Sequence, residues 1–409
     1  MASNRFRSTL LWIGLLYFAE GFPFGIVNDL LPVYFRSAGV SLRDIGLLSL
    51  LGLPWSLKVF WSPLVDRFGE RRHWIAACQL GMACVLVSLP LFPAGQIGWL
   101  LRALLLGFTA LSATQDVAID AYTIGVVARG QEGPANSVRV SAYRAALIVG
   151  GGGLVALAGL FPWSALFWMG AAVFVALALI SWRAPRLTIP SEHRRAFFRP
   201  LWAWLRRPTA PVMLVFILIY KLADASMTPM VKPFWIDRGL SPAEIGLIST
   251  TLGMIATVVG AICGGIWVKR RGIFHALWAL GLLQAASNLG YAAVAHFGLS
   301  RGFLYGASIF ESFSAGLGTA AFLSFLMNIC EKEHAAVQYA LLSALFGLSR
   351  SLAGGVSGWG AERLGYASYF GLTFLLALPA YALLPWVRTW IRDPAARGAE
   401  SGTASAGGP

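Results

Sequence analysis

Two aspartates stand four residues apart within a long apolar stretch of this 409-residue chain. The segment 112-SATQDVAIDAY-122 carries Asp116 and Asp120, and its surroundings from Ile97 to Val127 are almost continuously apolar. Residues at this spacing share one face of a helix. A carboxylate at the middle of a bilayer costs roughly 2.5 to 3.5 kcal/mol on insertion scales. The pair must therefore be matched by cations, be protonated, or face a water-filled path.

Other ionisable residues also fall inside apolar stretches, and their signs nearly balance. The acids are Glu20, Asp29, Asp224 and Glu311, and the bases are Lys58, Arg139, Arg144, Lys221 and Arg350. So many charges facing lipid would prevent stable insertion. Most of them are expected to face a cavity or one another.

The composition is that of a polytopic membrane protein. The chain is 57% hydrophobic and 12% charged, with a mean hydropathy of +0.68, which is too much apolar surface for one soluble core. The formal charge of +14 comes from basic residues in short loops, which is a pattern of membrane topology and not of nucleic-acid binding. The four cysteines and five histidines show no metal-ligand spacing, so neither a disulfide, a metal site nor a cofactor is expected.

About 20 apolar residues are needed to cross the hydrocarbon core. On that measure the sequence predicts an all-α membrane protein with about twelve transmembrane helices, the first of them an uncleaved helix and not a signal peptide. The predicted spans are 10–35, 43–64, 73–92, 97–127, 136–160, 163–182, 211–235, 243–268, 273–296, 301–328, 336–360 and 366–388.

Basic loops alternate with nearly neutral ones along the chain. The positive-inside rule assigns the basic side to the cytoplasm, and both termini with it. A linker at 183–210, with seven arginines and one acid, separates a six-helix bundle at 1–182 from a second at 211–392, and a polar tail at 393–409 is predicted to be disordered. The linker can lie along the inner leaflet or be a plain solvated connection.

An internal repeat supports this division. The segment 39-GVSLRDIGLLS-49 reappears as 239-GLSPAEIGLIS-249, and each copy opens the second helix of its half. Two homologous six-helix bundles are typical of alternating-access carriers, whose substrate site lies between the halves near the middle of the membrane.

Several segments carry a family resemblance. The turn 62-SPLVDRFGERR-72 resembles the loop between helices 2 and 3 of the major facilitator superfamily, with Pro63 near the place of the usual glycine. The segments 57-LKVFWSPLVDR-67, 112-SATQDVAIDAY-122, 220-YKLADA-225, 280-LGLLQAASNLGY-291, 310-FESFSAGLGTAAFLSFLM-327 and 338-QYALLSAL-345 together resemble the bacterial anhydromuropeptide permeases of the AmpG type.

The resemblance implies the major facilitator fold and a proton-coupled importer in the bacterial inner membrane. Its substrate would be a 1,6-anhydro-muramyl disaccharide or a peptide derivative, taken from periplasm to cytoplasm for peptidoglycan recycling. Partners would be the small-molecule substrate, protons and the bilayer, with the chain acting as a monomer. The same branch contains carriers for acetyl-coenzyme A, siderophores and drugs, which stay as alternatives.

Proton coupling is assigned to acids that can gain and lose a proton as the site opens to either side. Helices 97–127 and 136–160 run antiparallel, so Arg144 is the expected partner of Asp116 in a cavity. Asp120 can share this role, or form a structural or gating bridge with Arg139. Glu311, with no cation near it in sequence, is a second candidate proton carrier.

Substrate-facing roles are considered for a second set of polar residues. Lys221 and Asp224 can form an intrahelical pair or face the substrate. Lys58 can extend to the cytoplasmic surface or have a functional role. Glu20 precedes Pro23, which is expected to break the first helix, and broken helices often line a transport path. Amides and hydroxyls that can bind sugar groups, or simply join helices, belong to Gln115, Tyr143, Gln284 and Asn288.

Asp66 and Arg67, at the cytoplasmic end of the second helix, are interpreted as a conformational latch. A competing interpretation is a membrane-embedded enzyme, for instance an acyltransferase. The sequence contains neither an H-E-x-x-H nor a G-x-S-x-G motif that would support it.

Overall fold

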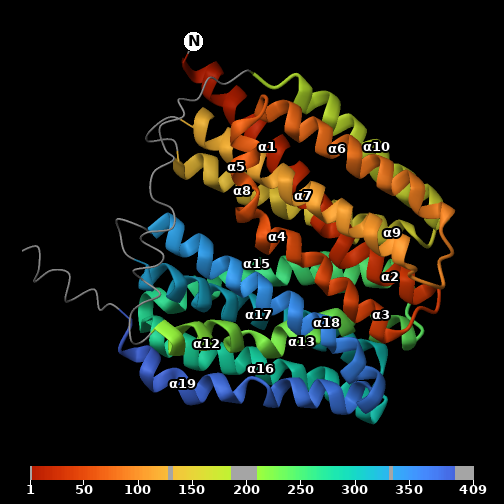
Figure 1. The fold of residues 1–409 in the computed structure, drawn as a ribbon. Coiled ribbons are helices and arrows are strands. Elements are labelled where there is room, and N and C mark those ends of the chain that lie inside the picture. The colour runs from red at the N-terminus through yellow and green to blue at the C-terminus, as the bar shows by residue number, and fades with distance from the viewer. Residues whose placement is uncertain (1, 128–131, 186–209, 331–334, 392–409) are drawn as a thin grey trace, which may run out of the picture.

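The computed structural model describes residues 2–127, 132–185, 210–330 and 335–391, and the regular elements in these ranges are helices (Figure 1). Most of the predicted linker and the predicted tail lie outside the described residues.

The first part of the chain forms a series of helical segments, some of which, such as the first three, follow one another in a single span. Their bounds are α1 (Ala2–Gly25), η1 (Ile26–Leu30), α2 (Leu31–Ser37), α3 (Leu42–Leu47), η2 (Leu48–Gly52), α4 (Leu53–Leu57), η3 (Lys58–Phe60), α5 (Ser62–Arg67), α6 (Arg71–Ser88), η4 (Leu89–Leu91), α7 (Trp99–Val126), α8 (Glu132–Leu147), η5 (Ile148–Gly153), α9 (Leu154–Leu157) and α10 (Trp163–Trp182). The predicted span 43–64 is not one regular helix, because η2 and η3 interrupt it with tighter turns.

The second part repeats this pattern with longer uninterrupted helices. Its elements are α12 (Ala210–Tyr220), α13 (Leu222–Asp237), α14 (Pro242–Glu244), η6 (Ile245–Leu252), α15 (Gly253–Arg271), α16 (Ile273–Phe297), α17 (Arg301–Ile329), α18 (Ala335–Leu375) and α19 (Leu378–Arg388). The backbone of α18 is not helical at Gly365, where φ is +73°, so two helices meet at a kink there. This kink separates the last two predicted spans, 336–360 and 366–388, and the second of them continues into α19.

By length and composition, eight helical stretches of the described residues can cross a membrane. They include Ser8–Ser37, Ala210–Asp237 and Pro242–Arg271, and the longest, Leu341–Arg388, covers the last two predicted spans. This confirms a multi-pass, all-helical membrane protein.

The repeated sequence segments form the same turn twice. Gly39 and Gly239 have φ values of +84° and +74°, a conformation that glycine adopts without strain. The serine two residues later caps the next helix in each copy: Ser41 Oγ accepts from the Asp44 amide, and Ser241 Oγ accepts from the Glu244 amide. The acids then pair with arginines of α7 and α17, Asp44 with Arg102 at 2.6 Å and Glu244 with Arg301 at 3.1 Å.

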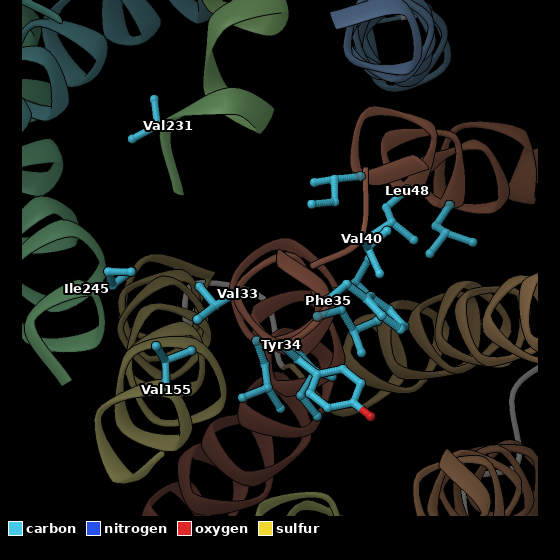
Figure 2. Close-up of a cluster of buried hydrophobic side chains, with 14 of the residues drawn as sticks. Val33, Tyr34, Phe35, Val40, Leu48, Val155, Val231 and Ile245 are labelled. Atoms are coloured by element: carbon cyan, nitrogen blue, oxygen red, sulfur yellow. The ribbon is translucent and has the colours of Figure 1, made fainter. Parts of the chain in front are cut away.

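Helices up to residue 182 pack mainly on one another, as do those from residue 210 onward (Figure 1). α1 packs on α8, α6 on α7 and α10, and, in the second group, α17 on α15 and α16. The two groups meet through a shared hydrophobic cluster. Figure 2 shows part of it, with Ile245 of η6 beside Val33 of α2 and Val155 of α9.

Glycines allow the two groups to approach closely at two related places. A Cβ on Gly46 of α3 would lie 2.6 Å from the backbone nitrogen of Gly358 in α18, and one on Gly246 of η6 would lie 2.5 Å from the carbonyl oxygen of Gly152 in η5. Gly46 and Gly246 occupy the same position of the sequence repeat. The sequence repeat thus supplies one of the two glycines in each close contact.

Candidate functional site

The two acids of α7 lie on one face, and a lysine from the second helical segment lies against both. Asp116 is 6% exposed. Lys58 Nζ is 3.6 Å from Asp116 Oδ2 and 3.9 Å from Asp120 Oδ2. Lys58 begins the tight turn η3, and the segment around it is held on α7 by hydrogen bonds from Trp55 to Ser112 and from Trp61 to Thr114.

The expected pairing of Asp116 with Arg144 is wrong. The guanidinium of Arg144 lies 3.0 Å from the sulfur of Met254 in α15. The reason is the helix arrangement, because α8 packs along α1, whereas α4 and η3 pack on α7. Lys58 of η3 is therefore the cation beside Asp116, and Arg144 contacts α15 instead.

The predicted pair of Asp120 and Arg139 is present. Arg139 Nη2 lies 3.2 Å from Asp120 Oδ1, and the Tyr17 hydroxyl donates to the same oxygen at 2.7 Å. The Arg139 guanidinium also covers the Tyr17 ring, 4.5 Å from its centre. These contacts join α1, α7 and α8.

Glu20 adds a third carboxylate to this cluster. It interacts electrostatically with Asp116 and Lys58. Its Oε2 is buried and accepts no hydrogen bond from the described residues, and the same holds for Asp116 Oδ1. We define the acidic cluster as Glu20, Lys58, Asp116, Asp120 and Arg139. It contains three carboxylates and two cations, so one bound proton would balance its charge.

A second group of polar residues lies inside the second half of the chain. Lys221 is 3% exposed. Its Nζ donates to Gln284 Oε1 at 2.6 Å and to Thr319 Oγ1 at 3.0 Å, and lies 3.9 Å from Asp224. The intrahelical pair with Asp224 is thus present, and the hydrogen bonds connect the start of α13 to α16 and α17.

The predicted amides mostly join helices. Gln115 Nε2 donates to the Ala19 carbonyl at 2.8 Å, and Asn288 Nδ2 donates to Thr373 at 3.0 Å. Of the two interpretations given to these residues, the interhelical hydrogen bond is the one that the geometry favours.

Glu311 has cations near it that the sequence did not indicate. It interacts electrostatically with Lys221 and with Lys232 of α13. Ser312 is its hydrogen-bond donor, at 3.4 Å.

Lys232 is a functional candidate that sequence reasoning missed. It forms an ion pair with Asp29 of η1 and donates to the Asn28 carbonyl at 3.1 Å, and so connects the two parts of the chain. Gly151 lies against Asp29, where a Cβ would clash. The signal was available, because Lys232 is a base within the predicted span 211–235, as Lys221 is.

A further connection lies at the end of the same helices. Arg36 donates to both carboxylate oxygens of Asp237 at 2.6 Å, and the Tyr366 hydroxyl donates to Asp237 at 2.6 Å. Such bidentate contacts are among the stronger polar interactions in proteins.

Two arginines and two aromatic rings gather from three helical segments, α1, α8 and α18. The Arg350 guanidinium lies 5.7 Å from the Phe24 ring, whose centre is 6.3 Å from that of Tyr143. Tyr143 interacts electrostatically with both Arg144 and Arg350. Within the described residues, neither arginine forms an ion pair with a carboxylate.

The latch residues are only partly described. Arg67 is exposed and its guanidinium lies 5.7 Å from the Phe68 ring. The Asp66 side chain lies outside the described side chains, so the latch stays a prediction.

Known proteins resemble the chain over nearly all of its length. It is 34% identical to the anhydromuropeptide permease of Escherichia coli (strain K12) over 92% of this chain and 79% of that protein. It is 29% identical to the putative transporter AmpG 4 of Rickettsia conorii, over 93% of this chain and 96% of that one. Residues 9–98 match the family model described as acetyl-coenzyme A transporter 1.

Solved structures share the fold. A bacterial homologue of the human lysosomal transporter Spinster, inward-facing and unoccupied, has a TM-score of 0.77 at 15% identity and covers 95% of this chain and 99% of that one. The nucleoside transporter NupG has a TM-score of 0.72 at 15% identity, covering 94% of this chain and 99% of that one. Together with the sequence relatives, these likenesses show a membrane transporter and not an enzyme. The chain belongs to the AmpG-type anhydromuropeptide permease family.

Proposed function

We propose that the chain is a proton-coupled secondary transporter that imports anhydromuropeptides from the periplasm to the cytoplasm for peptidoglycan recycling. The observation that carries the proposal is the acidic cluster, in which three carboxylates face two cations inside a chain 34% identical to an anhydromuropeptide permease. An ionisable residue inside a membrane span marks a functional site by default, and an uncompensated carboxylate there can bind a proton.

The proposed architecture is twelve transmembrane helices in two six-helix bundles, 1–182 and 211–392, joined by the basic linker 183–210. The twice-formed turn at Gly39 and Gly239 supports it, as do the matching acid–arginine pairs at Asp44 and Glu244. The basic loops support an inner-membrane orientation with both termini in the cytoplasm. We propose that one such chain forms the transport unit.

Contacts between the two halves support an inward-facing state. Ion pairs and glycine contacts between them gather at the ends of helices that carry Arg36, Asp237 and Gly46, which is the periplasmic end in the proposed orientation. In alternating access, these contacts would separate to admit substrate.

Substrate binding is assigned to the unpaired cations between the halves. Arg144 and Arg350 would bind a carboxylate of the muramyl or peptide group by charge-assisted hydrogen bonds. Tyr143 and Phe24 would contact the sugar rings from one side. Lys221, Asp224, Gln284 and Asn288 would position the helices and not touch substrate.

Protons would bind at Asp116, with Glu20 and Asp120 sharing the charge. Glu311, near Lys232, is the second proposed proton carrier. Lys58 would keep Asp116 ionised once the proton has left.

Acetyl-coenzyme A transport is the second candidate, favoured by the family match over residues 9–98. Siderophore or drug transport has the same fold and the same need for a charged site. Uptake into proteoliposomes, with anhydromuropeptide, acetyl-coenzyme A and a ferric siderophore tested in parallel, separates these candidates. We expect uptake of the first only, and uptake of either of the others in its place would overturn the substrate assignment.

A further inference from the structure

A groove lies on the outer side of the second half of the chain, where α15 ends and α16 begins. Its volume is about 500 Å³, and its lining is aromatic and basic: Trp267, Arg270, Arg271, Phe274, His275, Trp278 and Ala279. None of these residues belongs to the proposed transport path.

The local sequence explains how the groove forms. α15 ends in Lys269, Arg270 and Arg271, whose charges suit the negative end of the helix dipole. Gly272 follows with φ +81°, so the chain turns at once into α16. Trp267 and Trp278 then stand on neighbouring helices, and both are about half exposed, at 44% and 52%.

The charges at the groove are free to bind an anion. The lining residues include no acid. Within the described parts of the chain, Arg270 and Arg271 form no ion pair, in contrast to Lys58 and Lys232. A third arginine, Arg388 of α19, lies with its guanidinium 5.5 Å from the Phe274 ring at the edge of the groove.

Tryptophans at the level of the lipid headgroups and arginines beside them form the pattern by which membrane proteins hold anionic lipids. The turn is on the cytoplasmic side in the orientation proposed above, where the leaflet is the source of such lipids. A volume of about 500 Å³ is within the range of small-molecule sites, roughly 300 to 1,000 Å³.

We propose that this groove binds one anionic phospholipid, with its phosphate between Arg270 and Arg271 and the start of an acyl chain along Trp267 and Trp278. The bound lipid would hold the α15–α16 turn at the membrane surface. A zwitterionic lipid would lack the net charge that these arginines select.

Native mass spectrometry of the full chain in detergent tests the proposal, with phosphatidylglycerol, phosphatidylcholine and inorganic phosphate as probes. We expect one phosphatidylglycerol to bind in preference to phosphatidylcholine. Arg270→Gln together with Arg271→Gln should weaken that binding roughly thirtyfold, since two charges near the headgroup are lost. Arg270→Lys with Arg271→Lys should keep most of it.

The control removes the same charge elsewhere. Arg43→Gln with Arg363→Gln changes two exposed arginines at the other end of the molecule and should leave lipid binding unchanged. Trp267→Ala with Trp278→Ala should weaken lipid binding without affecting thermal unfolding by more than the control does.

Two results would overturn the proposal. One is equal retention of phosphatidylglycerol and phosphatidylcholine, which means a non-selective lipid shell. The other is full competition by inorganic phosphate with no effect of the tryptophan variants, which means a plain anion site. Both readouts are made without transport, so they stand or fall independently of the proposed function.

Discussion

Asp116 is buried beside one lysine and two further acids, and this local imbalance decides what its substitution does. Lys58 lies 3.6 Å from Asp116, while Asp120 has contacts of its own from Arg139 and Tyr17. Among the acids of the cluster, Asp116 therefore combines deep burial with a shared cation.

Replacing Asp116→Asn keeps the shape of the side chain and removes its proton exchange. We expect pH-gradient-driven uptake to fall by more than about tenfold, while counterflow exchange in the same proteoliposomes stays within about threefold of the unaltered protein. Asp44→Asn, an acid paired with exposed Arg102, is the matched control and should change neither. Equal loss of both activities would assign Asp116 to folding or substrate binding.

Arg144 and Arg350 should act on substrate affinity. Losing one charge-assisted hydrogen bond costs about 1.5 to 3 kcal/mol, so Arg144→Gln or Arg350→Gln should raise the KM for an anhydromuropeptide at least about tenfold. Arg363→Gln, at an exposed arginine stacked on Trp359, is the control. A substrate whose carboxylates are amidated should show no such difference between the variants, and a persisting difference would contradict direct recognition.

At this scale the sequence predicted two of the ion pairs, Asp120 with Arg139 and Lys221 with Asp224, but not the cation that lies beside Asp116. Hydropathy indicates how deep in the membrane Asp116 and Arg144 lie, but residues of several helices lie at the same depth, so depth does not identify their partners. Lys58 reaches Asp116 because η3 crosses α7, and that crossing depends on packing between distant segments. Lys232 carried the same signal as Lys221 and was overlooked.

The helical segments themselves were largely predictable, since long apolar runs are the strongest sequence signal in a membrane protein. The run 163–182 has the predicted bounds, and α16 and α17 differ from theirs by one residue at one end. The tight turns η2 and η3 were not predictable, because tertiary contacts determine them, whereas the kink at Gly365 lies between the two predicted spans 336–360 and 366–388.

Glycines at the contact between α3 and α18 yield a prediction about conformation. A Cβ on Gly358 would clash with the Leu42 backbone carbonyl. Gly358→Ala should therefore favour the state in which this end of the molecule is open. In spin-labelled protein with labels at positions 43 and 363, and with the exposed Cys84 and Cys263 replaced, the distance distribution should gain a longer component.

Gly371→Ala is the control on the same helix, because a Cβ there meets no atom within 4 Å. Its distance distribution should match that of the parent protein. If Gly358→Ala gives the parent distribution as well, the close contact does not decide which end is closed.

For the whole molecule, the repeated turn makes the two halves equivalent at their contact. Gly46 meets Gly358, and Gly246 meets Gly152. The ion pairs Arg36–Asp237 and Asp29–Lys232 add polar links between the halves. In the inward-facing state proposed above, the two halves touch chiefly at one end, and alternating access requires them to exchange that contact for one at the other end.

Accumulation of a labelled anhydromuropeptide in proteoliposomes tests the coupling of this exchange to protons most directly. With an acidic exterior, we expect the solute to accumulate inside well above its outside concentration, and a protonophore to reduce it to equilibrium. Accumulation that a protonophore leaves unchanged, or equilibration alone with the gradient present, would contradict a proton-coupled importer.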